Sequence, residues 1–165
     1  MSGTPENPET ATELNPGLRP GAGGGLARVR DGKRVLVIDD DPISRSIVRD
    51  LLACRGFEVD GAESAPSALE NVRRHHYDLL ILDIFLPGLD GRILHGSIEK
   101  IARELAGRTI FISHWDPMGA IGEYVERHGL FLKKPFSGEQ LLHAIDAVLG
   151  AVSGFGSGSG PGVAL

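Results

Sequence analysis

The chain has 165 residues, a formal net charge of -5 and 41% hydrophobic residues, which suit one acidic globular domain of ordinary size. The acidic balance argues against a nucleic-acid partner, and the single cysteine excludes an intramolecular disulfide. Since the sequence also has neither a signal-peptide pattern nor an apolar run long enough to span a membrane, we expect no membrane association and a cytoplasmic location.

Composition divides the chain into three segments. Residues 1–32 are rich in Pro and Gly, residues 151–165 are rich in Gly and Ser, and both have few apolar clusters. We expect both to be disordered tails, because such segments bury too little surface to offset the loss of chain entropy. Residues 33–150 are expected to form the folded part, as one domain with no second folded domain beside it.

Five short apolar runs are typical of buried parallel strands. In chain order they occupy residues 34–38, 57–60, 78–83, 108–113 and 130–133.

Amphipathic stretches alternate with these runs and predict five helices. The first begins near Pro42 and ends at Gly56, with an apolar face of Ile43, Ile47, Leu51 and Cys54. The second has Ser64 as its N-cap and ends near His75.

The third helix begins at Asp90 or Gly91, and its inward residues are expected to be Ile93, Ile98, Ile101 and Leu105. The fourth covers about residues 118–128 and is weakened by two glycines. The fifth is capped by Ser137 and is expected to face the sheet with Leu141, Leu142, Ile145, Val148 and Leu149.

Strict alternation of strands and helices predicts an α/β fold with right-handed crossovers and helices on both faces of a parallel sheet. We therefore expect a doubly wound, flavodoxin-like sheet with strand order 2-1-3-4-5 and a cleft where the strand order reverses.

Polar residues follow the predicted strands at the edge where such a sheet binds ligands. Asp39 and Asp40 follow the first strand, Asp83 ends the third, Ser113 ends the fourth and Lys134 follows the fifth. Adjacent carboxylates suit Mg²⁺, although without Asp83 the alternative would fit equally well, in which Asp41 caps the first helix and Asp39 and Asp40 are solvated. Asp83 favours phosphoryl chemistry, because a carboxylate facing a cation can attack phosphorus and form an aspartyl phosphate. Lys134 would neutralise phosphoryl oxygens, and Ser113 would donate a hydrogen bond to them.

Three segments together carry a resemblance to a known family. They are VLVIDDDP at 35–42, LLILDIFLPGLDG at 79–91 and KPF at 134–136. In this order and at these intervals they resemble the receiver domain of two-component response regulators, over about residues 33–150.

The resemblance implies that Asp83 is the phosphoacceptor and that Lys134 contacts the phosphoryl group. It implies that Mg²⁺ is ligated directly by Asp40, by Asp83 and by the backbone carbonyl of Phe85, with Asp39 acting largely through water.

The same resemblance assigns the switch hydroxyl to Ser113 and the aromatic switch residue to Phe131, with a cis Lys134–Pro135 bond. It implies a phosphorylation-dependent signalling switch rather than an enzyme. The expected partners are a sensor histidine kinase or a histidine phosphotransfer protein, and an effector on the face of the fourth helix, fifth strand and fifth helix. The sequence leaves homodimerisation open and predicts no output domain in this chain.

Three residues depart from the family pattern. Phe85, His114 and Trp115 are bulkier than the residues usual at their positions, and they are expected to restrict access to the phosphoryl site. Restricted water predicts slow self-dephosphorylation. The alternatives are that Trp115 points to solvent or into a partner, and that His114 is a plain loop histidine.

Two other functions fit parts of the pattern. A haloacid-dehalogenase-like phosphatase would use Asp39 as nucleophile and Asp41 as acid, but it leaves Asp83 unexplained. A pseudo-receiver would be a protein-binding module that is never phosphorylated, although this chain retains the acidic pair, the phosphoacceptor and the lysine that such a module would be expected to lose.

Overall fold

The computed structural model describes residues 32–153, and the predicted disordered tails lie almost entirely outside this range. Its five-stranded sheet has the order β2-β1-β3-β6-β7, with all neighbours parallel. The strands are β1 (Arg34–Ile38), β2 (Glu58–Ala62), β3 (Leu79–Asp83), β6 (Thr109–Ser113) and β7 (Leu130–Lys133). Because β6 and β7 are the fourth and fifth strands of this sheet, the predicted fold class and strand order are confirmed.

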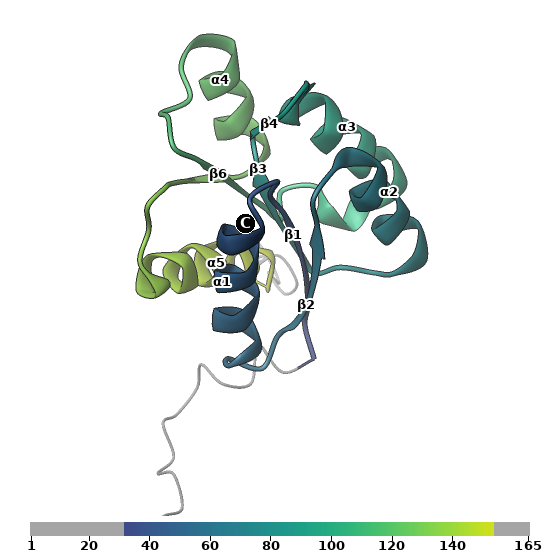
Figure 1. Cartoon of the computed structure of the whole chain (residues 1–165), viewed down its shortest axis with the longest axis vertical. Coiled ribbons are helices and arrows are strands. Elements are labelled where there is room, and N and C mark those ends of the chain that lie inside the picture. The colour runs from purple at the N-terminus through teal and green to yellow at the C-terminus, as the bar shows by residue number, and fades with distance from the viewer. Residues whose placement is uncertain (1–31, 154–165) are drawn as a thin grey trace, which may run out of the picture.

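Five α-helices cover the two faces of the sheet (Figure 1). Their bounds are α1 (Pro42–Ala53), α2 (Ala65–Arg74), α3 (Gly91–Ile101), α4 (Gly119–His128) and α5 (Gly138–Ser153). Helix α5 thus continues past the predicted domain boundary at residue 150. Within the described range, no helix is both long and apolar enough to cross a bilayer.

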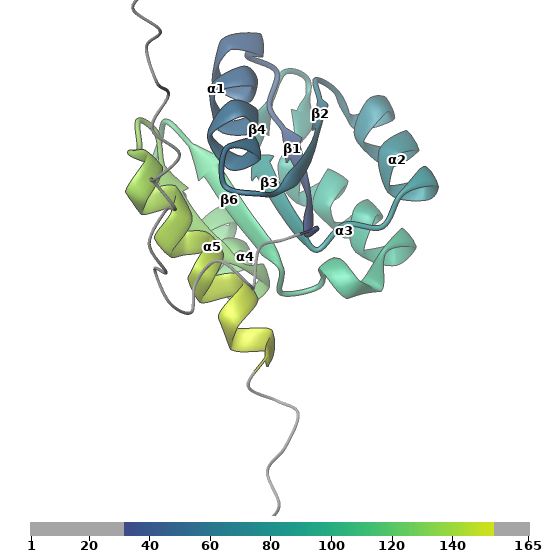
Figure 2. The ribbon, with the colours of Figure 1, turned by 90° about the horizontal axis from the view of Figure 1, so that it is seen from below.

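The strands contribute alternate side chains to two separate cores, as a pleated strand buried on both faces must. Val35, Val37 and Ile81 pack with α1 and α5, whereas Leu36, Ile38 and other residues of opposite parity pack with α2, α3 and α4. Figure 2 shows α1 and α5 on one side of the sheet and α2 and α3 on the other.

Side-chain caps begin two of the helices where the sequence predicts them. The Ser64 hydroxyl accepts from the backbone N–H of Ser67 in a reciprocal capping box at the start of α2. Before α5, the Ser137 hydroxyl accepts from the Gln140 N–H at 3.2 Å, while the Ser137 N–H donates to Gln140 Oε1 at 2.8 Å. Both arrangements satisfy amides that the first helical turn leaves unpaired.

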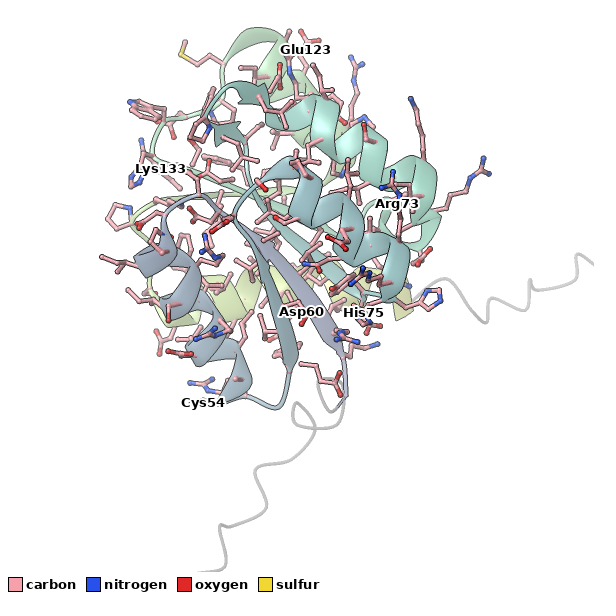
Figure 3. The ribbon with its side chains drawn as sticks, turned by 45° about the vertical axis from the view of Figure 1, so that its right-hand side comes forward. Cys54, Asp60, Arg73, His75, Glu123 and Lys133 are labelled. Carbon is pink, nitrogen blue, oxygen red and sulfur yellow. The ribbon has the colours of Figure 1, made fainter. Side chains whose placement is uncertain are left out.

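The predicted inward face of α1 is wrong except at Leu51, which is partly buried against the core. The helix buries Val48 and Leu52, whereas Ile43 is 70% exposed and Ile47 is 63% exposed. Cys54, predicted to pack inside, is exposed at the end of this helix (Figure 3). Successive residues are rotated by about 100° around a helix, so two apolar stripes can lie side by side. In α1 the sheet contacts the stripe of Val48 and Leu52, which lies next to the stripe of Ile43 and Ile47.

The buried face of α3 also lies next to the face that the sequence predicts. It buries Leu94, His95 and Ile98, while Ile93 is 64% exposed and Ile101 is 42% exposed. The inward position of Ile98 is confirmed, and those of the other two isoleucines are wrong. Leu105 is buried as predicted, but in the short 3-10 helix η2 (Arg103–Leu105). All five predicted inward residues of α5 are buried.

A short hairpin that the sequence analysis did not predict follows β3. It pairs β4 (Phe85–Leu86) with β5 (Leu89–Asp90) in antiparallel fashion. The hairpin brings the backbone of Gly91 close to that of Ile84. A Cβ added to Gly91 would lie 2.6 Å from the Ile84 carbonyl oxygen. Only glycine fits such an approach, which fixes the loop directly after Asp83.

Candidate functional site

The ends of three strands bring Asp39, Asp83 and Lys134 into contact. Asp39 follows β1, Asp83 ends β3 and Lys134 follows β7. The Lys134 Nζ donates to Asp39 Oδ2 at 2.7 Å and to Asp83 Oδ2 at 2.7 Å. The predicted convergence of carboxylates and an ammonium at this edge is present in the structure.

Lys134 is a fixed positive charge at the centre of this cluster. Its side chain is only 7% exposed. Burial alone would lower the pKa of Lys134, but its hydrogen bonds to Asp39 and Asp83 outweigh burial and hold the pKa above its ordinary value. The ammonium therefore stays protonated at neutral pH.

Asp39 is fully buried and held by protein donors on both oxygens. Its Oδ1 accepts from the Asp41 N–H at 3.0 Å, and its Oδ2 accepts from the Ser44 hydroxyl at 2.7 Å as well as from Lys134. Much of its acceptor capacity is thus used within the protein.

Asp40 and Asp83 complete an acidic group that fits a hard cation. Asp39, Asp40 and Asp83 each offer a carboxylate oxygen, and these oxygens lie within 4.8 Å of one another. Asp83 Oδ1 accepts from the Phe85 N–H at 2.9 Å, which orients this carboxylate. Oxygen donors of this kind suit Mg²⁺.

Asp41 has a structural role at the start of α1. Its Oδ1 accepts from the Ile43 N–H at 3.0 Å and caps the helix. This use as a cap weighs against Asp41 as the acid of a phosphatase.

The two predicted switch residues lie on neighbouring strands. The Ser113 side chain is buried, and its hydroxyl accepts from the Trp115 N–H at 3.0 Å. Phe131 is partly buried on β7, next to Phe111 of β6, and packs on the core beneath α2, α3 and α4. The Ser113 carbonyl also accepts from the Lys134 N–H at 2.7 Å, which ties the switch strand to the lysine.

A cavity of about 250 Å³ contains the acidic group and Lys134. The predicted access residues Phe85, His114 and Trp115 line it, whereas Ser113 is not among its lining residues. The rings of Phe85 and Trp115 pack edge to face, with centroids 6.0 Å apart. Trp115 is nevertheless 67% exposed, so its ring stands at the rim of the cavity.

A second, more apolar groove adjoins this cavity. It is lined by Ile43, Ile47, Pro135 and Phe136, and it shares Lys134 and two further residues with the first. We call it the α1 groove. The sequence does not predict this groove, because the helical spacing of both isoleucines indicates a core position. The peptide between Lys134 and Pro135, two residues that line the groove, is cis, as the family resemblance implies.

Comparison with known proteins shows the family of this chain. The family model described as the response regulator receiver domain matches residues 35–146. The chain is 30% identical over 118 residues to the chemotaxis protein CheY of Bacillus subtilis, covering 70% of this chain and 97% of that protein. It is 35% identical over 120 residues to the transcriptional activator protein PfeR of Pseudomonas aeruginosa, covering 70% of this chain but 37% of that protein.

Solved structures share the fold. A CheY-like receiver domain protein from Methanospirillum hungatei has a TM-score of 0.68 at 22% identity, covering 74% of this chain and 98% of that one. The response regulator TrrA from Thermotoga maritima, solved in complex with Mg(2+)-BeF, has a TM-score of 0.62 at 28% identity, covering 70% of this chain and 98% of that one. The chain belongs to the family of response regulator receiver domains.

Proposed function

We propose that this receiver domain is a phosphorylation-dependent switch in which Asp83 accepts a phosphoryl group. The donor is a phosphohistidine on a sensor histidine kinase or a histidine phosphotransfer protein. The observation that carries the proposal is the buried Lys134 ammonium, 2.7 Å from an oxygen of Asp83 and beside the acidic group. The role is that of a signalling switch rather than an enzyme.

In the transfer, a carboxylate oxygen of Asp83 forms a bond to phosphorus while the bond from phosphorus to the donor's histidine nitrogen breaks. Lys134 stabilises the charge on the phosphoryl oxygens, and it requires no reorganisation because its carboxylate partners already hold it in place. The Ser113 hydroxyl would turn from the Trp115 N–H to donate to the same oxygens.

Mg²⁺ would be held directly by Asp40, Asp83 and the Phe85 carbonyl, and by Asp39 through water, since Asp39 already accepts hydrogen bonds on both oxygens. When bound, it would neutralise charge on the transferred group and its acceptor.

The switch proposed here runs from Ser113 to Phe131. Movement of the hydroxyl toward the phosphoryl group lets the aromatic ring follow, which repacks α4, β7 and α5. An effector would recognise this face. A cytoplasmic location stays a prediction from the sequence, which leaves homodimerisation through α5 open.

The α1 groove is the proposed contact surface for the donor. A phosphohistidine must reach Asp83 through the rim of the cavity, and the groove shares Asp41, His114 and Lys134 with that cavity. Ile43 and Ile47 there are mostly exposed, as expected for apolar anchors that a partner covers.

The test is incubation of the full chain with acetyl phosphate and Mg²⁺, followed by intact mass over time. We expect a phosphoryl adduct on the native chain and none on an Asp83→Asn variant. An adduct on both chains would show that a residue other than Asp83 accepts the phosphoryl group. Absence of adduct, both from acetyl phosphate and from phosphorylated histidine kinases, would favour the pseudo-receiver.

A further inference from the structure

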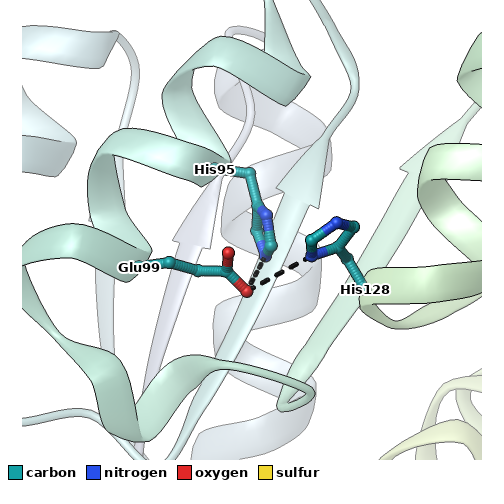
Figure 4. Close-up of side chains that lie close together, drawn as sticks. All are labelled: His95, Glu99 and His128. Atoms are coloured by element: carbon teal, nitrogen blue, oxygen red, sulfur yellow. Dashed lines mark ion pairs between the residues drawn. The ribbon is translucent and has the colours of Figure 1, made fainter.

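A second cluster of ligating side chains lies between α3 and the end of α4, outside the acidic site (Figure 4). Glu99 Oε1 lies 3.7 Å from His95 Nε2 and 3.5 Å from His128 Nδ1. The ligand atoms of all three lie within 4.8 Å of one another. His95 and Glu99 are four residues apart on α3 and so share one face of the helix.

The ring of His95 is fixed by its other nitrogen. His95 is fully buried, and its Nδ1 lies 2.9 Å from the Tyr124 hydroxyl oxygen. That hydroxyl donates its single hydrogen to the Arg92 carbonyl at 3.2 Å. Nδ1 must then be the donor to Tyr124, and Nε2 carries a lone pair. A hydrogen bond of this kind orients histidine ligands in metal sites.

This lone pair lies 3.7 Å from the Glu99 carboxylate oxygen, so a cation placed between the two atoms would be attracted to both. The Thr109 hydroxyl donates to the same Nε2 at 3.0 Å, and a bound cation would take its place.

His128 completes the set from the other helix. Its ring stacks on Tyr124, with centroids 4.2 Å apart and planes 21° apart. Tyr124 therefore positions both histidines. The side chains of His128 and Glu99 are 33% and 21% exposed, which leaves a route for an ion from solvent.

We propose that His95, Glu99 and His128 form a binding site for a divalent transition-metal ion of the zinc class, joining α3 to α4. Two neutral imidazole nitrogens and one carboxylate are a ligand set that Zn²⁺ accepts, with a fourth position left for water. At metal–ligand distances of about 2.0–2.1 Å, tetrahedral geometry places ligand atoms about 3.4 Å apart. The two separations from Glu99 are close to this value. Mg²⁺ prefers oxygen ligands and would remain at the acidic site.

The test is calorimetric titration of the full chain with Zn²⁺, in excess Mg²⁺ so that the acidic site is filled. We expect one Zn²⁺ per chain, and at least a tenfold loss of affinity in both Glu99→Gln and His128→Gln, since even outer-shell changes cost about 10–100-fold. The matched control is His143→Gln, at an exposed histidine of α5, which should bind as the native chain does.

A second probe reports the ligands themselves. Co²⁺ should give the visible absorption of a four-coordinate site in the native chain and in Asp83→Asn, but not in His128→Gln. The proposal is overturned if the native chain takes up no Zn²⁺, if the Glu99 and His128 variants bind as tightly as native, or if His143→Gln loses as much affinity. Neither probe depends on phosphorylation, so failure here leaves the proposed function untouched.

Discussion

The Lys134 ammonium lies between the two buried carboxylates of Asp39 and Asp83. We expect Lys134→Met to lower the free energy of unfolding by about 3 kcal/mol, because it leaves buried negative charges without their cation. Mg²⁺ should raise the Tm of this variant more than that of the native chain, since the ion supplies the missing charge. Thermal unfolding with and without Mg²⁺ measures both effects.

The neighbouring Lys133 provides the control for this experiment. It is 53% exposed and pairs with Asp116 at the surface. Lys133→Met should change the free energy of unfolding by less than about 1 kcal/mol and leave the Mg²⁺ effect as in the native chain. An equal Mg²⁺ effect in all three chains would contradict the assigned role of Lys134.

Trp115 stands at the rim of the cavity and packs against Phe85. If this pair limits the approach of water, Trp115→Ala should lose the phosphoryl group several-fold faster than the native chain, because the acyl phosphate becomes more hydrated. Decay of the adduct after removal of acetyl phosphate measures this rate. Trp115→Phe keeps a ring there and should stay near the native rate. The same rate in all three chains would show that Trp115 faces solvent or a partner only.

Asp60 accepts hydrogen bonds from the Tyr77 hydroxyl at 2.7 Å and from Arg34 Nε at 2.8 Å. It lies in the middle of the edge strand β2, away from Lys133 of the opposite edge strand β7 (Figure 3). Burial would raise the pKa of Asp60, but these hydrogen bonds outweigh it and hold the pKa below its ordinary value of 3.8. A lowered carboxyl pKa stabilises the fold above pH 3.8, and this contribution is lost as the pH falls through the folded-state pKa.

We therefore expect Asp60→Asn to lower the free energy of unfolding at pH 7 by about 1–2 kcal/mol, and to flatten the fall in stability below about pH 4. Urea unfolding at a series of pH values gives both results. Glu58→Gln, at an exposed site on the same strand, is the control and should keep the native profile. If stability falls at acid pH in Asp60→Asn as it does in the native chain, carboxylates other than Asp60 cause that fall.

At the scale of the element, the junction of α4 and β7 depends on Gly129. A Cβ added there would lie 2.2 Å from the Thr109 carbonyl oxygen, which is backbone and cannot move aside cheaply. We expect Gly129→Ala to destabilise the chain by about 3 kcal/mol, toward the upper end of overpacking costs. Gly150→Ala is the matched change, because an added Cβ meets nothing within 4 Å there.

Gly150 lies in α5. Gly150→Ala should stabilise the chain by about 0.5–1 kcal/mol, because alanine loses less backbone entropy in a helix than glycine does. Chemical denaturation of the two variants compares them directly. Equal effects would show that the backbone near Thr109 relaxes around the new methyl group.

The sequence predicts strands better than helix faces in this chain, and the reason is geometric. A strand buried on both sides is apolar at every position, so Val35 to Ile38 needs no choice of face. Helix α1 has two adjacent apolar stripes, one with Ile43 and Ile47 and one with Val48 and Leu52. Which stripe meets the sheet depends on how the helix packs, and periodicity does not contain that information.

Helix packing also explains why the residues at the strand ends were predictable and the cluster between α3 and α4 was not. Asp39, Asp83 and Lys134 were predictable together, because parallel strands end at one edge and each residue follows a strand. The spacing of His95 and Glu99 could have shown that they share a helix face. Their meeting with His128 depends on how α3 and α4 pack, which no local pattern fixes.

At the scale of the whole molecule, two equally exposed isoleucines on different helices allow docking of the donor to be tested separately from phosphorylation of Asp83. Ile47 of the α1 groove is 63% exposed, and Ile93 of α3 is 64% exposed. Given a histidine kinase that phosphorylates the native chain, Ile47→Lys should slow that transfer at least tenfold, because the donor loses an apolar anchor. Ile93→Lys should not slow it.

Both variants should accept phosphate from acetyl phosphate at the native rate, since neither residue lines the cavity that contains Asp83. Transfer measured with each donor separates the two steps. Slower acetyl phosphate reactions in Ile47→Lys would mean that the groove shapes the site itself, and equal kinase rates in both variants would place the donor elsewhere.

The Lys134 contacts also bear on how the protein is made. They join positions 95 and 51 residues apart in sequence, to Asp39 and Asp83 respectively. A nascent chain on the ribosome exposes both aspartates well before it exposes the lysine. Until β7 leaves the exit tunnel and pairs with β6, the two carboxylates lack their ammonium partner. An unfinished chain should therefore be a poor phosphate acceptor, which would keep partly synthesised copies from competing for the signal.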